Sequence, residues 1–150
     1  MEILAYDPFL TAGDVTLDLH PVYNHEFTIN VKTVSKEELL ANADFISLHI
    51  PGGQGYVLDT PEFEQMKDGV GVVNCARGGT INEAALLGAI KSGKVKYAAT
   101  DVFEKEPPVN TDILRMNAVG LSPHIGASTE EAQERVGIEL AQNIINFFNS

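Results

Sequence analysis

The sequence has only one cysteine and few basic residues, and each shortage excludes a class of protein. The single cysteine, Cys75, excludes an internal disulfide and favours a reducing compartment, so we expect a cytoplasmic protein. Ten basic residues stand against 21 acidic ones, and the formal net charge is -11 at pH 7. Such a chain repels phosphate backbones and anionic lipids, which excludes nucleic acid and membrane surfaces as partners.

Long apolar runs are also missing. No stretch approaches the roughly 18 uninterrupted apolar residues of a membrane span, and no basic segment followed by an apolar one marks the N-terminus as a signal. What is present is an ordinary globular composition, with 150 residues of which 44% are hydrophobic and 21% charged. This length is enough for one domain with a real core.

Short apolar runs alternate with helical patterns along the chain. Residues 2–6, 45–50, 70–74, 97–102 and 119–122 have the pattern of strands buried on both faces, and residues 27–31 form a weaker candidate. Between them, helix starts are predicted by a capping box of Ser35 and Glu38, by Pro61, and by Asn82, whose helix ends before Gly93. Repeated strand–helix–strand units predict an α/β fold with a doubly wound, Rossmann-like parallel sheet.

The last segment is a long amphipathic helix. Ser128 and Glu131 match a capping box, and one apolar stripe runs to the C-terminus through Ala132, Val136, Leu140, Ile144 and Phe147. The helix either covers the sheet or reaches a second domain or subunit. We divide the chain into residues 1–122, which carry the predicted sheet, and residues 123–150, a histidine loop and the long helix.

Polar residues follow each predicted strand, at the end where open parallel sheets bind ligands. They are Asp7, then His49 and Pro51, then the run Cys75-Ala76-Arg77-Gly78-Gly79, then Asp101 and Glu106, and finally Pro123-His124. A surface selected only for solubility would spread these groups over both ends of the sheet. The clustering therefore predicts a binding site at this edge.

Several residues at this edge have side chains suited to specific chemistry. The planar fork of Arg77 suits a bidentate grip on a carboxylate, and His124 could exchange a proton with a hydroxyl or carbonyl near neutral pH. Either Glu104 or Glu106 could hold the histidine ring, and their spacing does not choose between them. Asp7 lies where an acid of a dinucleotide fold accepts hydrogen bonds from ribose hydroxyls, although an Asp-Pro turn is the simpler explanation.

Other candidates are weaker. The Gly52–Gly55 cluster does not have the spacing of a pyrophosphate-binding loop, and Cys75 alone has the pattern of a small core residue. We assign no role to His20 and His25.

Four motifs in order resemble the D-isomer-specific 2-hydroxyacid dehydrogenase family. They are LAYDP (4–8), VVNCARGG (72–79), DVFEKEP (101–107) and SPHIGASTEEAQ (122–133). The last run is most similar to family members that act on 3-phosphoglycerate, a substrate of serine biosynthesis. The resemblance implies an NAD-dependent oxidoreductase that transfers hydride between nicotinamide and a D-2-hydroxy acid or its 2-oxo acid.

The resemblance also implies roles for single residues. Arg77 would bind the substrate carboxylate and carbonyl, His124 would be the acid/base, and Glu106 rather than Glu104 would be its partner. Asp7 would bind the ribose of the cofactor and Asp101 its nicotinamide end. The further residues expected to line the cofactor are His49, Pro51, Cys75, Ala76 and Gly126, and no metal is expected.

Two departures from the family pattern are visible. The loop at residues 51–56 lacks the usual threonine, and the first strand, the glycine loop and the N-terminal part of the substrate domain have no counterpart. We therefore expect a fragment that is inactive alone and that needs the missing segment of the enzyme or a second copy, as in a homo-oligomer. The alternative is a catalytically silent, self-associating half-domain.

Overall fold

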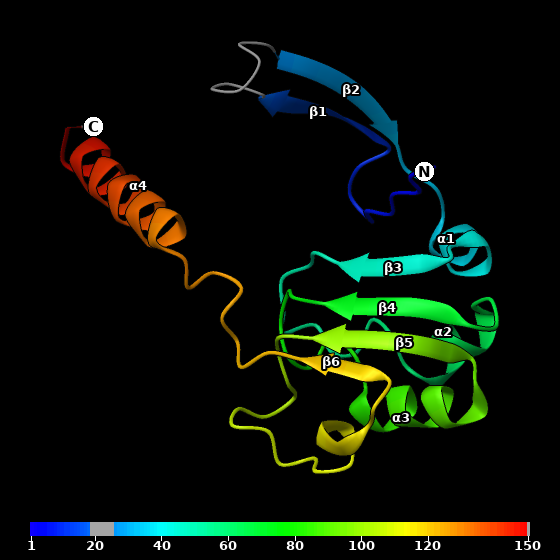
Figure 1. Ribbon diagram of the computed structural model, residues 1–150. Helices are drawn as coiled ribbons and strands as arrows, with labels where there is room; N and C mark the ends of the chain where they lie inside the picture. The colour runs from blue at the N-terminus through cyan, green and yellow to red at the C-terminus, as the bar shows by residue number, and fades with distance from the viewer. Residues whose placement is uncertain (19–25, 150) are drawn as a thin grey trace.

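The computed structural model describes residues 1–18 and 26–149, and a four-stranded parallel sheet forms its centre (Figure 1). The strand order is β3-β4-β5-β6, and all four carboxyl ends lie at the same edge. The bounds are β3 (Phe45–Leu48), β4 (Val70–Asn74), β5 (Val95–Thr100) and β6 (Val119–Leu121). Four of the five predicted principal strands are thus confirmed, and so is the parallel α/β class.

Helices alternate with these strands. They are α1 (Lys36–Asn42), α2 (Thr60–Gln65), α3 (Glu83–Ser92) and the short 3-10 helix η1 (Ile113–Arg115). The three α-helices begin at side chains that cap them, whereas η1 has no side-chain cap. Ser35 caps α1 and Asn82 caps α3, as predicted, while Asp59 caps α2 and places Pro61 in its first turn. Gly93 ends α3 in the left-handed conformation, where a side chain would be strained.

The two faces of the sheet differ in what covers them. Ile46, Val72 and Ala98 stand opposite one another in the register and belong to one core with the buried residues of the helices. The next row is Phe45, Gly71 and Tyr97, in which both rings are exposed. A Cβ on Gly71 would lie 2.4 Å from the ring of Phe45, so this position accepts no side chain while the ring stays in place.

The N-terminal part of the chain differs from the prediction. Residues 2–6 do not form a buried strand, because only Ala5 makes an isolated bridge, to Thr33. The weaker candidate at 27–31 is a strand, β2 (Glu26–Lys32), but its partner is an antiparallel strand that was not predicted, β1 (Ala12–Asp18). A β-hairpin therefore occupies the segment in which the alternation of strands and helices predicts a crossover helix.

The β1–β2 hairpin separates apolar from polar side chains. Val15 pairs with Ile29 and Leu17 with Phe27 on one side, and all four are about half exposed. On the other side Thr16 and Thr28 are joined by a 3.1 Å hydrogen bond, and Asn30 donates to Asp14 at 2.8 Å. This alternation is typical of a sheet with one face turned to water.

The last helix, α4 (Glu130–Asn149), stands apart from the sheet (Figure 1). Its first-turn hydrogen bond runs from the Ala132 N–H to the hydroxyl of Thr129, so the prediction of a Ser128 cap is wrong by one residue. No residue of α4 is buried, and the helix does not cover the sheet. Within the described residues, no helix combines the length and the apolar character needed to cross a bilayer.

Candidate active site

The loops at the carboxyl ends of the four parallel strands carry most of the predicted site residues (Figure 1). His49 follows β3, Arg77 follows β4, Asp101 follows β5 and His124 follows β6. Parallel pairing aligns these strand ends, because each strand is hydrogen-bonded in register to the next. The fold therefore gathers residues that are up to 75 positions apart in the sequence at one edge of the sheet.

A short side-chain contact at this edge joins His124 to Glu106. Nδ1 of His124 lies 2.6 Å from Oε2 of Glu106, and the other carboxylate oxygen accepts the backbone N–H of Phe103 at 3.1 Å. The carboxylate is thus held at both oxygens, and the imidazole keeps Nε2 for another partner. His124 is about half exposed, so that nitrogen is open to a ligand.

Glu104, the other acid considered as a partner of the histidine, has a different contact. Its carboxylate accepts the backbone N–H of Glu83 at the start of α3, at 2.8 Å. The geometry thus distinguishes two acids that the sequence spacing left equivalent.

Asp101 is buried at the end of β5, with 3% of its surface exposed. Its Oδ1 accepts the hydroxyl of Ser122 at 2.6 Å and the N–H of Ile125 at 2.9 Å, while Oδ2 accepts the N–H of Gly126 at 2.7 Å. All three donors belong to the loop that carries His124. Ser122 was missed by the sequence reasoning, and its place directly before the Pro-His pair was the one available signal.

Hydrogen bonds lower the pKa of both acids that face this loop. The hydroxyl of Ser122, followed by the N–H groups of Ile125 and Gly126, holds the pKa of Asp101 below its ordinary value, although burial acts in the opposite direction. The pKa of Glu106 is lowered mainly by its hydrogen bond with His124. Both carboxyl groups are therefore anionic near neutral pH, which favours positive charge or hydrogen-bond donors beside them.

Two buried polar residues, Asn74 and Thr80, hold the turn that carries Arg77. Asn74, at the end of β4, donates to the Thr80 hydroxyl at 3.0 Å and accepts the N–H of Ala76 at 3.1 Å. Thr80 in turn donates to the carbonyl of Arg77 at 2.7 Å. Both were missed as site residues; a polar residue that ends a buried apolar run was a usable signal for Asn74, whereas Thr80 had none.

The side chain of Arg77 is exposed at this turn. Its Nη1 donates to the carbonyl of Ala76 at 2.7 Å, and a Cβ on Gly52 would lie 3.0 Å from its Cβ. Gly52 therefore lets the loop after β3 pass close to the stem of Arg77. Arg77 thus lies exposed at the same edge of the sheet.

The residues expected to line the cofactor have different environments. The side chain of His49 is hydrogen-bonded to Ser47 at 2.9 Å, and Pro51 and Cys75 are exposed. The interpretation of Cys75 as a small core residue is therefore wrong. Oδ1 of Asp7 accepts the backbone N–H groups of Phe9 at 2.7 Å and Leu10 at 3.2 Å, which closes a turn. His20 and His25, for which we predict no role, lie outside the described residues.

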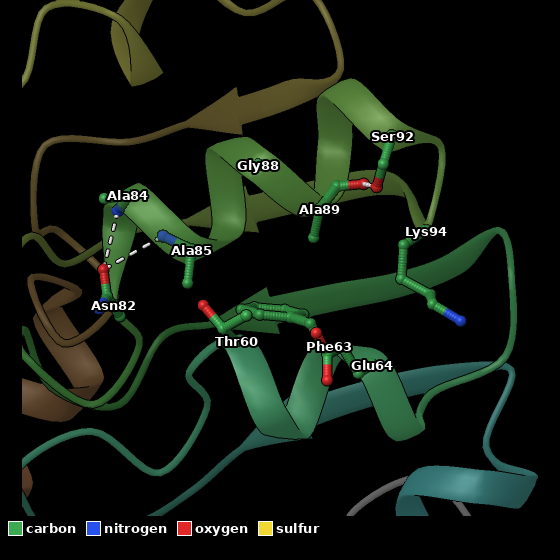
Figure 2. Close-up of a pocket in the computed structure, with 10 residues that line it drawn as sticks. All are labelled: Thr60, Phe63, Glu64, Asn82, Ala84, Ala85, Gly88, Ala89, Ser92 and Lys94. Atoms are coloured by element: carbon green, nitrogen blue, oxygen red, sulfur yellow. Dashed lines mark hydrogen bonds between the residues drawn. The ribbon is translucent and has the colours of Figure 1, made fainter.

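A surface cleft of about 450 Å³ lies away from this edge, between α2 and α3 (Figure 2). The side chains along it include Thr60 and Phe63 from α2 and Ala85 and Ala89 from α3, with Lys94 at one end. None of the predicted site residues lines it. We read the cleft as the gap between two short helices rather than as a part of the site.

Comparisons with known proteins identify the family of this chain. The family model described as "D-isomer specific 2-hydroxyacid dehydrogenase, NAD binding domain" matches residues 1–126. D-3-phosphoglycerate dehydrogenase of Archaeoglobus fulgidus is 45% identical over 149 residues, which cover 97% of this chain and 26% of that protein. The chain thus spans about a quarter of the length of this curated relative.

Solved structures give the same result. A glyoxylate reductase from Paecilomyes thermophila is similar with a TM-score of 0.72 and 40% identity, over 76% of this chain and 35% of that one. D-lactate dehydrogenase from Aquifex aeolicus, solved with NAD and lactic acid, has a TM-score of 0.70 and 28% identity, over 79% of this chain and 41% of that one. The fold, like the motifs, is therefore that of a nucleotide-binding domain.

Proposed function

Since the chain belongs to the D-isomer specific 2-hydroxyacid dehydrogenase family and matches its NAD-binding domain, we propose that the protein oxidises a D-2-hydroxy acid, or reduces its 2-oxo acid, with NAD. The observation that carries the proposal is the His124–Glu106 pair, whose Nδ1–Oε2 distance is 2.6 Å. We further propose 3-phosphoglycerate as the substrate. The GASTEEAQ run at 126–133 and the 45% identity to a D-3-phosphoglycerate dehydrogenase support this choice.

In this proposal each residue has one task at the reacting carbon. Arg77 binds the carboxylate of the hydroxy acid through its exposed guanidinium. Nε2 of His124 takes the hydroxyl proton as C2 is oxidised, and returns it in reduction. Glu106 fixes the ring through Nδ1 and stabilises the imidazolium that forms. NAD, when bound, supplies the acceptor for the hydride that leaves C2.

The residues present fit NAD at the ribose end. A carboxylate has about four lone-pair positions, so Asp7 can accept ribose hydroxyls while its Oδ1 still accepts from Phe9 and Leu10. The exposed positions Pro51 and Cys75, and Ala76 beside them, would lie along the cofactor as the loops after β3 and β4 approach it. A cytoplasmic location belongs to the same proposal.

The test is to purify the full-length protein and measure NAD reduction with 3-phosphoglycerate, D-lactate and D-glycerate, with the L-isomers as controls. We expect activity with at least one D-isomer and a loss of about 100-fold or more in kcat for His124→Asn, because general acid–base catalysis contributes about that much. Arg77→Lys should raise KM for the hydroxy acid, since lysine cannot make the bidentate contact. Arg135→Lys on α4 is the matched control and should leave both constants unchanged.

Activity with L-isomers alone, or full activity of His124→Asn, would contradict the proposal. If D-lactate or D-glycerate were used far better than 3-phosphoglycerate, the family activity would stand and only the substrate would be wrong.

A second, non-catalytic role is favoured by the exposed apolar side chains of α4. Val136, Leu140, Ile144 and Phe147 recur at helical spacing and are all at least half exposed. We propose that this stripe mediates association with a second copy. Light scattering on the purified protein should give twice the mass of the monomer. Leu140→Asp should reduce the measured mass to that of the monomer, whereas Glu139→Asp should leave it unchanged. A monomeric wild type would refute association.

A further inference from the structure

Two side chains that lie inside the fold hold the backbone carbonyl of Arg77. This carbonyl accepts the side-chain amide of Asn74 at 3.2 Å and the hydroxyl of Thr80 at 2.7 Å. Asn74 is 3% exposed and Thr80 is 2% exposed. A buried polar side chain costs free energy unless its hydrogen bonds are made. Here those hydrogen bonds are made to the backbone of an exposed residue.

The two buried side chains are also bonded to each other. The Asn74 amide donates to the Thr80 hydroxyl at 3.0 Å, and this hydroxyl gives its one hydrogen to the carbonyl of Arg77. The amide oxygen of Asn74 accepts the N–H of Ala76 at 3.1 Å. The orientation of both side chains is therefore set, and they fix the backbone at Arg77 and at the residue before it.

Thr80 also joins this turn to the loop that follows β3. Its backbone carbonyl accepts the N–H groups of Val57 at 2.7 Å and Leu58 at 3.2 Å. The same loop passes the stem of Arg77, where a Cβ on Gly52 would lie 3.0 Å from the Cβ of the arginine. One buried residue therefore holds both the turn of Arg77 and the loop beside it.

The loop after β5 confines the other flank of the turn. A Cβ on Gly78 would lie 1.8 Å from the carbonyl oxygen of Phe103, and Gly79 has a φ of 72°, in the left-handed region that favours glycine. Arg77 itself is exposed, and its Nη1 donates to the carbonyl of Ala76 at 2.7 Å. The backbone beside Arg77 is thus confined by both neighbouring loops, whereas the residue itself is open to a ligand.

We propose that Asn74 and Thr80 are positioning residues, which fix the backbone of Arg77 so that its guanidinium meets the substrate carboxylate in one place. This inference rests on the function proposed above for Arg77. A bidentate contact requires two N–H donors to reach two oxygens together, so a shift of the backbone weakens it even though the charge is retained. The pair therefore sets the affinity for the hydroxy acid without touching it.

The experiment compares Thr80→Val, Thr80→Ser and Asn74→Ala in the full-length protein, with Ser92→Ala as the matched control. Valine has nearly the shape of threonine without the hydroxyl, and serine keeps the hydroxyl. Ser92 also donates its hydroxyl to a backbone carbonyl, that of Ala89 at 3.1 Å, but at the end of α3. Three quantities are measured: kcat and KM for the hydroxy acid, the dissociation constant of oxamate by calorimetry with NADH present, and the free energy of unfolding. Oxamate has the carboxylate of a 2-oxo acid but is not reduced.

We expect Thr80→Val and Asn74→Ala to raise KM and the oxamate dissociation constant by about three- to tenfold, the range that corresponds to one hydrogen bond. Their kcat should stay within about twofold of the wild type, because a loss of binding shared by ground state and transition state raises KM alone. Thr80→Ser should keep both constants within about twofold of the wild type. Ser92→Ala should lower the free energy of unfolding about as much as Thr80→Val does, and should leave KM unchanged.

Unchanged KM and unchanged oxamate binding in both Thr80→Val and Asn74→Ala would overturn the inference. An equal rise of KM in Thr80→Ser would also overturn it, since the hydroxyl would then not be the cause. If Asn74→Ala did not fold, the two substitutions at Thr80 would decide alone. A wild type without dehydrogenase activity, but with oxamate binding that Thr80→Val weakens, would refute the proposed function alone, because calorimetry requires no turnover.

Discussion

Glu83 and Glu104 hold each other's backbone: the carboxylate of each accepts the N–H of the other at 2.8 Å. Glu83 is the first residue of α3 and is buried, so its N–H is one of the first-turn donors that have no partner within the helix. Glu104 supplies that partner from the loop after β5. The reciprocal contact fixes this loop to the start of α3 and leaves Glu106, two residues later, to face the histidine.

This relationship predicts that Glu104 and Glu106 have separable effects. Glu106→Gln should lower kcat by at least about tenfold, because the imidazolium loses its carboxylate partner. Glu104→Gln retains an acceptor for the Glu83 N–H and should leave kcat unchanged. Steady-state rates check the prediction, and equal losses of kcat in the two variants would contradict it.

We predict that the protein prefers NAD to NADP through the charge of Asp7. A carboxylate accepts two ribose hydroxyls but repels a 2′-phosphate, so kcat/KM should favour NAD. Asp7→Asn keeps an oxygen for the Phe9 and Leu10 N–H groups, and should narrow the preference by about tenfold because the like charges no longer meet. The ratio of kcat/KM for the two cofactors is the measurement. If the ratio in the variant equalled that of the wild type, the assignment of Asp7 to the ribose site would be wrong.

Two glycines that look equivalent in the sequence should respond oppositely to alanine. A Cβ on Gly78 would lie 1.8 Å from the carbonyl oxygen of Phe103, a backbone atom, so Gly78→Ala should cost more than about 3 kcal/mol. Gly88 lies within α3 with open space around it, and Gly88→Ala should stabilise the fold by about 0.5–1 kcal/mol. Urea denaturation measures both free energies of unfolding. Equal effects would show that the close approach at Gly78 is wrong.

The lowered pKa of Asp101 predicts how its contribution to stability depends on pH. A carboxyl group with a lower pKa in the folded state stabilises the fold above its unfolded pKa, about 4, and loses that contribution as the pH falls through the folded value. Asp101→Asn should therefore be less stable than the wild type at pH 7, and the difference should shrink below pH of about 4. Denaturation curves at several pH values test this. If the difference in the free energy of unfolding grew towards low pH, the prediction would be contradicted.

The central sheet was predictable because its strands are short, mainly apolar runs that alternate with helical patterns. Only β4 is buried at most of its positions. The prediction of strands buried on both faces is wrong for β3 and β5, in which Phe45 and Tyr97 are exposed. The clustering of polar residues at the strand ends followed directly, since parallel strands share a carboxyl edge. The sequence could place His124 and Arg77 at that edge, but it could not choose Glu106 over Glu104, because both lie within a short loop whose path depends on contacts with α3.

The N-terminal part was mispredicted for a physical reason. Residues 2–6 are apolar but find no strand to pair with beyond the Ala5–Thr33 bridge. The hairpin was missed because half of its side chains are polar, and because the pattern of neither strand shows which strand it pairs with. The Ser128 cap failed because two hydroxyl residues, Ser128 and Thr129, are adjacent at the start of the helix, and Thr129 is the one used although the residue three positions after it is Ala132 and not a glutamate.

The division of the β1–β2 hairpin into two sides has a consequence for which changes of length this segment tolerates. Successive residues of a strand alternate between its two sides. One residue inserted at the start of β1 would therefore move Val15 and Leu17 to the polar side of the hairpin, and Asp14 and Thr16 to the apolar side. Two inserted residues would restore the original arrangement. Changes in even steps should therefore preserve the hairpin, while a change of one residue should survive only as a bulge.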